Sequence, residues 1–148
     1  MFVTTQGEYA LRCMMALASA GEGGMLSLKQ LAEAEALSKD YVGKILNRLK
    51  KAGLVRPTHG SRGGYHLARP SPEITVRDVY LAAEGDGFKI FCLDEDFKEG
   101  DCRHYPRCGL KQVWKRVYEA AYEVMGSVTL EMLARGETCV REKLKAVS

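Results

Sequence analysis

The sequence predicts a mostly α-helical fold that carries one small β-hairpin and continues into a long, separate helix. Apolar residues recur at helical spacing over most of the first 84 residues, and two short β-prone runs flank a glycine-rich turn. An apolar stripe then covers four or more helical turns from Leu110. A length of 148 residues and a hydrophobic content of 46% allow one compact core with a helical arm, but not two large domains.

The first two helices are expected at about residues 7–20 and 28–36. A glycine-rich segment at 21–24 ends the first helix. Ser27 and Gln30 have the spacing of a capping box, in which each side chain satisfies a free backbone N–H of the other residue. The second helix therefore begins after Ser27.

A third helix is expected between Ser38, a good N-cap, and Gly53, which ends it. Its apolar residues fall on one side: Tyr41, Val42, Ile45, Leu46 and Leu49. The opposite side is polar and basic. Residues 54–56 and 65–67 then read as the strands of a hairpin with a basic tip.

Thr75 and Asp78 form a second capping box, which opens a fourth helix. After it, residues 91–108, here called the cysteine segment, lose periodicity, and we expect no regular structure there. The apolar stripe of the following helix needs a partner surface, because the core is already complete. A short helix near 130–134 and a charged, frayed tail complete the prediction.

Four parts follow from this pattern. We expect a first domain at 1–84, a sensor loop at 85–109, a dimerisation helix with a short C-terminal helix at 110–135, and a tail at 136–148.

Charge is distributed unevenly along the chain. The formal net charge is only +3, yet eight Lys and Arg residues lie between Ser38 and Arg69 against the single acid Asp40. A basic segment of this kind is typical of a phosphate-binding surface, although a charge run alone more often marks a solvated helix face.

Two helices, a basic second helix and a basic hairpin form the layout of a winged helix-turn-helix, which binds double-stranded DNA. Gly43 would let the backbone of the third helix approach base edges closely. A competing interpretation, a phosphate loop of a nucleotide enzyme, fails because no Lys-Ser or Lys-Thr follows the glycines. The expected DNA-binding residues are Ser38, Lys39, Asp40, Tyr41, Gly43, Lys44, Asn47, Arg48 and Lys51, with His59, Ser61, Arg62 and Gly63 in the hairpin.

The five cysteines favour metal or redox chemistry over a disulfide framework. The chain lacks an export signal and a membrane-spanning stretch, so we expect a soluble cytoplasmic protein with no membrane partner. Cys92, Cys102 and Cys108 lie in one flexible segment and are able to surround a soft metal centre. Unliganded thiols are the alternative. Cys13 fits the core better, and Cys139 lies in the tail without a ligand role.

Three thiolates are one donor short of the usual four. The fourth donor is open from the residues alone: His104, the acidic residues of the cysteine segment and Glu8 are all candidates.

From residue 4 to 133 the sequence resembles the family of winged-helix transcription regulators that includes IscR, NsrR, RirA and CymR. The matching stretches are 7–12 (GEYALR), 49–55 (LKKAGLV), 60–68 (GSRGGYHLA), 74–79 (ITVRDV), Cys108 with Trp114, and 128–130 (VTL). The resemblance implies a homodimer that places two recognition helices on a palindromic operator. It also implies that Cys92, Cys102 and Cys108 hold an iron-sulfur cluster of two or four irons.

Three positions depart from the pattern of some relatives. Lys111 stands where some have a histidine as the fourth ligand, whereas Glu8 matches an acidic ligand that others supply from the partner subunit. The resemblance therefore favours Glu8 over His104. Gly43 and His59 replace a base-reading acid and a wing arginine, so the operator sequence is not transferred.

The resulting hypothesis is a DNA-binding transcription regulator, expected to be a repressor and not an enzyme, whose operator affinity depends on the cluster. The first alternative is a regulator of the same fold that senses thiol oxidation or a small metabolite. A thiol oxidoreductase is disfavoured because the chain has no C-x-x-C pair. A winged helix used for protein contacts is disfavoured by the basic face.

Overall fold

Three helices meet around the hydrophobic core of the computed structural model, which describes residues 4–85 and 90–147. They are α1 (Thr5–Ser19), α3 (Lys39–Lys51) and α4 (Val76–Glu84). The fully buried side chains come from all three helices and from the segments around them: Met14, Leu17, Leu31, Val42, Ile45, Leu46, Leu49, Val55, Ile74, Val79 and Leu130. The apolar residues whose helical spacing predicted these elements are therefore the residues that form the core.

The helix-turn-helix consists of α2 (Leu28–Ala34) and α3. The Ser27 Oγ accepts a hydrogen bond from the Gln30 amide at 3.2 Å, and the Ser27 amide donates to the Gln30 Oε1 at 2.8 Å. The Ser38 Oγ likewise accepts from the Tyr41 amide at 3.2 Å. Both helix starts are confirmed, while α2 ends two residues earlier than the expected Ala36, which adopts a positive φ of 54°.

The wing, residues 54–67, is built from β1 (Val55–Thr58) and β2 (Gly64–Leu67), which pair antiparallel. The other edge of β2 is also occupied: Tyr65 donates to Leu26 at 2.8 Å and accepts from it at 3.0 Å. The wing is thus tied by backbone hydrogen bonds to the segment that leads into α2. The expected hairpin is confirmed, and its position relative to the helix-turn-helix is fixed.

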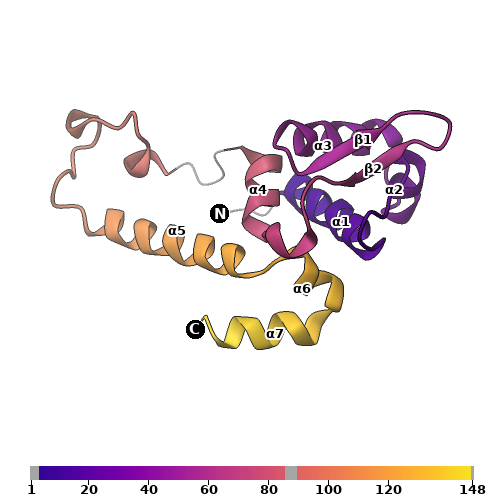
Figure 1. The fold of residues 1–148 in the computed structure, drawn as a ribbon. Helices are drawn as coiled ribbons and strands as arrows, with labels where there is room; N and C mark the ends of the chain where they lie inside the picture. Colours follow the sequence, from indigo (N-terminus) through magenta and orange to yellow (C-terminus); the bar gives the residue numbers. More distant parts are fainter. Residues whose placement is uncertain (1–3, 86–89, 148) are drawn as a thin grey trace.

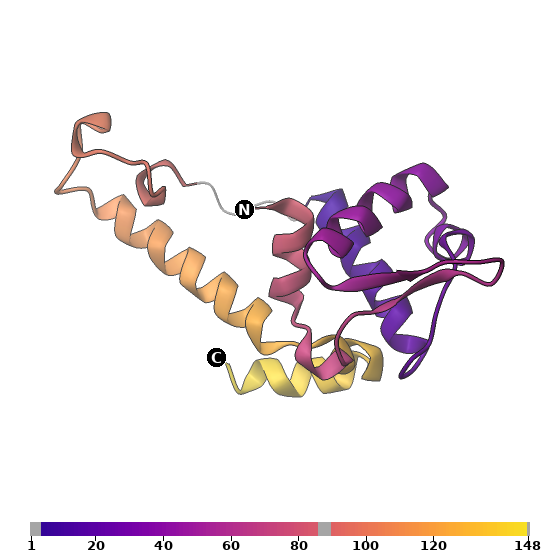
Figure 2. The same ribbon diagram turned by 45° about the horizontal axis from the view of Figure 1, so that its top comes forward.

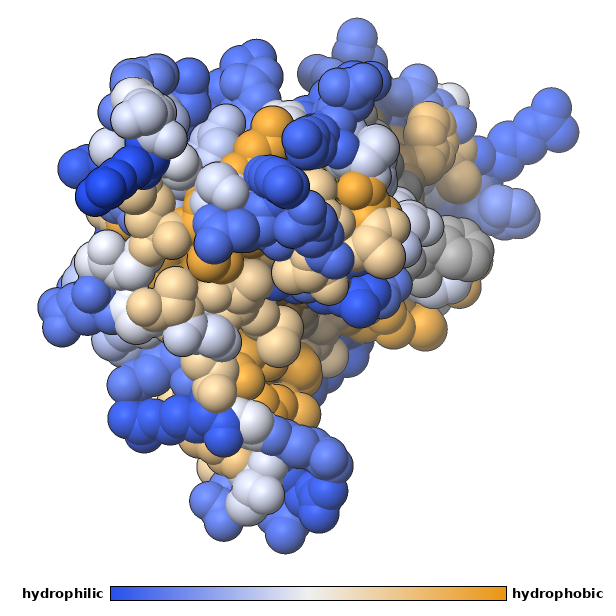
Figure 3. All heavy atoms as spheres, turned by 90° about the vertical axis from the view of Figure 1, so that its right-hand side faces the viewer, coloured by the Kyte–Doolittle hydropathy of each residue, from blue (hydrophilic) through white to orange (hydrophobic). Residues whose placement is uncertain are grey.

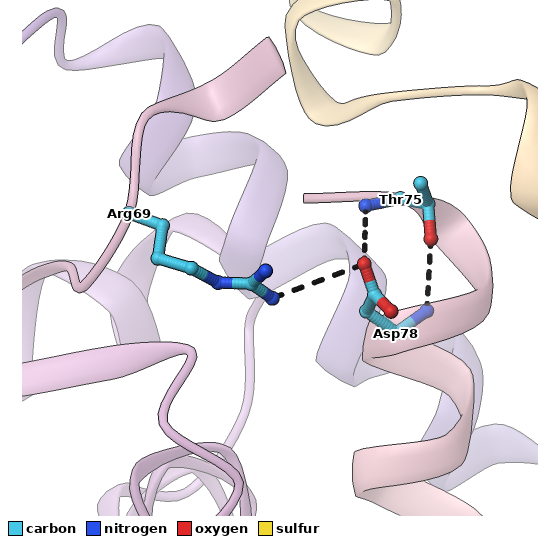
Figure 4. A network of polar contacts seen from close by, with 3 residues as sticks. All are labelled: Arg69, Thr75 and Asp78. Carbon is cyan, nitrogen blue, oxygen red and sulfur yellow. Dashed lines mark hydrogen bonds and ion pairs between the residues drawn. The ribbon is translucent and has the colours of Figure 1, made fainter. Parts of the chain in front are cut away.

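A capping network places the start of α4. The Thr75 amide donates to the Asp78 Oδ2 at 2.9 Å, and the Asp78 amide donates to the Thr75 Oγ1 at 3.1 Å, as the sequence predicted. The same Asp78 carboxylate lies 3.9 Å from a guanidinium nitrogen of Arg69, which follows the wing (Figure 4). One carboxylate therefore caps α4 and attracts the chain that arrives from β2.

The long helix α5 (Gly109–Ser127) extends away from this body and carries the cysteine segment at its far end (Figures 1 and 2). Its other end is attached firmly, because Val76 donates to Val128 and Leu130 donates to Ile74, both at 2.9 Å. No residue of α5 is buried. The predicted helix is confirmed, and it is an arm rather than part of the core.

The prediction of no regular structure in the cysteine segment is wrong at two places. Two short 3-10 turns, η2 (Phe91–Leu93) and η3 (Glu99–Asp101), form there. They are held by local hydrogen bonds, from Leu93 to the Ile90 carbonyl at 2.8 Å and from the Lys98 amide to the Asp101 carboxylate at 2.9 Å. Hydrogen bonds between residues three positions apart do not require a periodic pattern of apolar residues, so these turns could not be predicted from periodicity.

The expected frayed tail is also wrong. After α6 (Leu130–Arg135), the chain forms a further helix, α7 (Glu137–Lys145), which packs against α6 and α5. Val140 and Leu144 are partly buried, and Arg141 forms an ion pair with Glu137 one turn away. Tertiary packing and this ion pair stabilise a segment whose charge had suggested disorder.

Candidate nucleic-acid interface and cysteine loop

The outer face of α3 is polar and open to solvent. Lys44, Asn47 and Lys51 are exposed, and Ile45, Leu46 and Leu49 lie on the opposite side at no more than 1% exposure. Lys39 and Asp40, in the first turn, are exposed as well. Seen from the side of the wing, hydrophilic side chains cover much of the molecular surface, with apolar side chains between them (Figure 3).

Gly43 lies in the middle of α3, and the fold does not require a glycine there. A Cβ added at this position would meet no atom within 4 Å apart from its chain neighbours and the nearby backbone of its own helix. Glycine inside a helix is unfavourable compared with alanine. Because no neighbour within the chain excludes a side chain, a glycine at this position fits a close approach by another molecule.

Ser38 and Tyr41, both predicted to bind DNA, have contacts within the fold. The Ser38 hydroxyl caps α3. Tyr41 is partly buried and packs edge-on against Tyr9 of α1, with ring centroids 6.1 Å apart. These contacts orient α3 on the body, and they leave Tyr41 less available than the exposed lysines.

Arg48 also contacts the fold directly. Its NH1 donates a hydrogen bond of 2.8 Å to the carbonyl of Ala83, near the end of α4. The sequence placed Arg48 at the edge of the basic face, and helical spacing alone gives no sign of a partner that is 35 residues away.

The tip of the wing presents His59, Ser61 and Arg62 to solvent. Gly60 adopts a positive φ of 119°, and the Gly63 amide donates to the Gly60 carbonyl at 3.0 Å. A Cβ at Gly63 would lie 2.4 Å from the Thr58 carbonyl oxygen. Here the glycines are required by the tight turn itself.

One exposed cation of the wing, Arg56, is absent from the predicted set of site residues. It lies in β1 opposite His66 and follows the buried Val55. The alternation of a buried and an exposed residue along the strand is the signal that identifies it.

Cys92, Cys102 and Cys108 all lie within the cysteine segment as free, partly buried thiols. Cys92 belongs to η2, Cys102 follows η3, and Cys108 is the N-cap residue of α5. The donor set suits an iron-sulfur cluster in kind, because such clusters prefer thiolate ligands. Among residues 4–85 and 90–147, however, no three His, Cys, Asp or Glu side chains are grouped as a metal site.

His104 and Glu8, the two candidates for a fourth ligand that were compared by resemblance, lie apart in sequence and in the fold. His104 is exposed within the cysteine segment. Glu8 belongs to the first turn of α1, where its side chain is 60% exposed and lies 3.7 Å from Arg12. The structure of the single chain does not join either residue to the three cysteines.

Aromatic rings organise the cysteine segment. Phe97 contacts Phe91 and Tyr105, each at a centroid distance of 5.6 Å. The Lys111 ammonium lies 5.5 Å from the Phe97 ring and 5.2 Å from the Tyr105 ring. A hydrogen bond with Glu99, together with the negative charge of that carboxylate, raises the pKa of Tyr105. The segment is therefore attached to the first turn of α5 through Lys111.

Cys13 is fully buried, as the sequence predicted for a core residue. Burial raises the pKa of its thiol to about 11, and the nearby Glu35 carboxylate acts in the same direction. Cys139 lies in α7 and is partly buried.

A helix-turn-helix with a polar, basic second helix and an adjoining two-stranded wing defines the class of winged-helix DNA-binding proteins. The chain belongs to the Rrf2 family, described as iron-dependent transcriptional regulators, whose model matches residues 3–136. It is thus a DNA-binding transcription regulator of that family and not an enzyme.

In the described part of the chain, no helix is both long and apolar enough to cross a membrane.

Two relatives illustrate the similarity. CymR of Bacillus subtilis is 32% identical over 134 residues, which cover 90% of this chain and 90% of CymR. The solved structure of IscR from T. potens is 35% identical, with a TM-score of 0.71 over 93% of this chain and 90% of IscR.

A third relative, CymR of Staphylococcus aureus solved in its oxidized form, is 34% identical with a TM-score of 0.70. That match covers 90% of this chain and 96% of the other.

The contrast between two glycines gives a first prediction. Gly43→Ala is expected to raise the free energy of unfolding by about 0.5–1 kcal/mol, because alanine is the better helix former. It is expected to weaken binding to duplex DNA at the same time. Urea denaturation and fluorescence anisotropy with a labelled duplex measure the two effects. Gly64→Ala is the control for a glycine that the fold requires. Its Cβ would lie 2.7 Å from the Leu26 carbonyl oxygen, so this substitution should lower the free energy of unfolding. A gain in both stability and affinity for Gly43→Ala would contradict the interpretation.

Proposed function

We propose that this regulator binds a palindromic operator as a homodimer through α3 and the wing, acts as a repressor, and changes its operator affinity with the state of the cysteine segment. The observation that carries the proposal is the solvent-open cationic face of α3, followed along the chain by the exposed basic tip of the wing. The family supplies the expectation of DNA binding, and the exposed residues of α3 and of the wing make it specific.

Two lysines on other helices form ion pairs that the cations of this face do not form. Lys29 in α2 and Lys115 in α5 each lie 3.8 Å from a glutamate one turn away. Within the described ranges, no such ion pair involves Lys44, Lys51 or Arg62. A cation without a carboxylate partner is free to neutralise a phosphate, which supports binding to the DNA backbone.

Within this surface each part has a separate role. The α3 helix enters the major groove, where Gly43 allows close contact and Asn47 offers a donor and an acceptor to a base edge. Lys39, Lys44 and Lys51 contact phosphates. His59, Ser61, Arg62 and Gly63 at the wing tip follow the backbone or enter the adjacent minor groove.

Lys44→Ala and Arg62→Ala are expected to weaken DNA binding without loss of folding. Each removes one phosphate contact, so the slope of log K against log salt should fall by about 1 in magnitude. The probe is a fluorescein-labelled duplex that the wild-type chain selects from a randomised library. Lys29→Ala, on α2, is the matched control and should keep the wild-type slope. Wild-type binding by both variants would refute the assigned surface.

We further propose that a second copy of this chain covers α5. Four apolar side chains of α5 follow one another at spacings of four, three and seven residues, and each is 41–55% exposed: Leu110, Trp114, Val117 and Val124. That spacing is the seam of two helices that pack along each other. An apolar stripe on an arm that leaves the body is costly in water, and a symmetric partner arm would bury it.

Val117→Glu is expected to weaken the dimer on the order of a hundredfold or more, because the association would bury an unpaired charge. Gln112→Glu adds the same charge on the opposite side of α5 and should leave the dimer intact. Light scattering coupled to size-exclusion chromatography gives the mass of each variant. A wild-type chain that stays monomeric at all concentrations, or a dimeric Val117→Glu variant, would contradict the proposal.

The cysteine segment is proposed to be the sensor. Cys92, Cys102 and Cys108 would hold an iron-sulfur cluster, with Glu8 of the second chain as the preferred fourth ligand and His104 as the weaker candidate. A bound cluster would supply a centre that is oxidised, reduced or lost in response to a signal. Support comes from the three free thiols on one segment, the family description as iron-dependent, and the similarity to IscR.

A second candidate uses the same thiols without a cluster. The similarity to CymR, described for Bacillus subtilis as the global cysteine regulator and solved for Staphylococcus aureus in an oxidized form, favours thiol oxidation as the signal.

Anaerobic purification separates the two candidates. A cluster regulator is expected to be brown and to contain iron and acid-labile sulfide in stoichiometric amounts. Cys102→Ser should lose both, whereas Cys139→Ser, in α7, should keep them. A colourless wild-type protein whose DNA affinity still changes on thiol oxidation would establish the second candidate and refute the first.

A further inference from the structure

The carbonyl of Ala83 joins three helices. Arg48 of α3 donates to it at 2.8 Å, and the Gln6 side chain of α1 donates to the same oxygen. Ala83 is 1% exposed and is the last but one residue of α4. Carbonyl groups in the last turn of a helix have no partner within the helix, so these two side chains complete the end of α4.

Charge strengthens one of the two contacts. The carboxyl end of a helix carries a partial negative charge, and α4 has no basic residue in its last turn. The Arg48 guanidinium supplies the missing positive charge from a neighbouring helix. A hydrogen bond from a charged donor is stronger than one from the neutral Gln6 amide.

The position of Arg48 on α3 determines what this contact controls. Arg48 is itself exposed, and three other exposed polar residues of α3 lie near it: Lys44 one turn before, and Asn47 and Lys51 on either side. A shift of the last turn of α3 relative to α4 would therefore strain or break the bond between Arg48 and Ala83. Because α3 is one continuous helix, such a shift would also change the positions of Lys44, Asn47 and Lys51.

We propose that Arg48 is a positioning residue for DNA recognition. It clamps the last turn of α3 to the carboxyl end of α4, sets the angle at which Lys44 and Asn47 meet the duplex, and does not itself bind a phosphate or a base. This inference rests on the proposed DNA-binding surface and changes the role of one residue within it.

Salt dependence tests the assignment, because only a lost phosphate contact changes the number of released counterions. Arg48→Met keeps the length and the apolar stem but removes the charge and the donor. It is expected to lower affinity for the selected duplex about tenfold, from the loss of a charged hydrogen bond, with the wild-type salt slope. Lys44→Ala, measured under the same conditions, is expected to reduce the magnitude of the slope of log K against log salt.

Two further variants exclude a purely structural effect. Gln6→Met removes the other donor to the Ala83 carbonyl from α1, so it should lower the melting temperature and leave DNA affinity unchanged. Arg48→Lys retains a charged donor on a flexible stem and should recover part of the affinity. Hydrogen exchange of backbone amides in the last turn of α3 should accelerate in Arg48→Met and less so in Arg48→Lys.

The outcomes distinguish this inference from the proposed function. A wild-type chain that selects no duplex would overturn the proposed function and the role of Arg48 with it. A wild-type chain that binds, combined with a reduced salt slope for Arg48→Met, would overturn the positioning role alone. Unchanged affinity for Arg48→Met, or equal losses of affinity for Gln6→Met and Arg48→Met, would overturn it as well.

Discussion

Burial of one side of α3 is the constraint on which the rest of the structure depends. Ile45, Leu46 and Leu49 are essentially inaccessible to water, and each would lose on the order of 1.5–3 kcal/mol if it became exposed. The helix therefore cannot rotate about its axis without a large loss of stability. Since the apolar side is fixed inward, Gly43, Lys44 and Asn47 are presented outward by the same packing. The core holds the proposed recognition surface in place without any contact to DNA.

Polar contacts add the precision that apolar packing lacks. A hydrophobic contact is not directional, whereas a capping hydrogen bond fixes where a helix begins. Ser27, Ser38 and Thr75 each cap one helix of the body, and Asp78 also attracts Arg69 after the wing. The hydrogen bonds between Tyr65 and Leu26 tie the wing to the start of α2. The wing is thus held against the helix-turn-helix, although twelve residues lie between Lys51 and the first residue of β2 at Gly64.

The sequence predicted those features whose causes are local. A capping box needs residues three positions apart, so Ser27 with Gln30 and Thr75 with Asp78 were readable directly. Helical periodicity likewise identified the buried side of α3 and the apolar stripe of α5. The bond from Arg48 to Ala83 was not readable, because it depends on how α3 crosses α4. The helix α7 was missed for a similar reason: its stability depends on contacts with α5 and α6 that its charged composition does not reveal.

The cysteines show the limit of spacing arguments most clearly. Nine and five intervening residues permit three thiols to meet, but loop closure costs entropy that some interaction must offset. In the single chain, the aromatic contacts of Phe97 and the Lys111 ammonium organise the segment without grouping the sulfurs. A cluster would have to supply the closing free energy through its iron-sulfur bonds. If the proposed dimer also brings Glu8 of the second chain to the segment, cluster binding and pairing of the α5 arms stabilise each other, because ligands from two chains couple the two equilibria. The sensor would then be a property of the dimer, which is why neither the sequence nor the fold of one chain contains it complete.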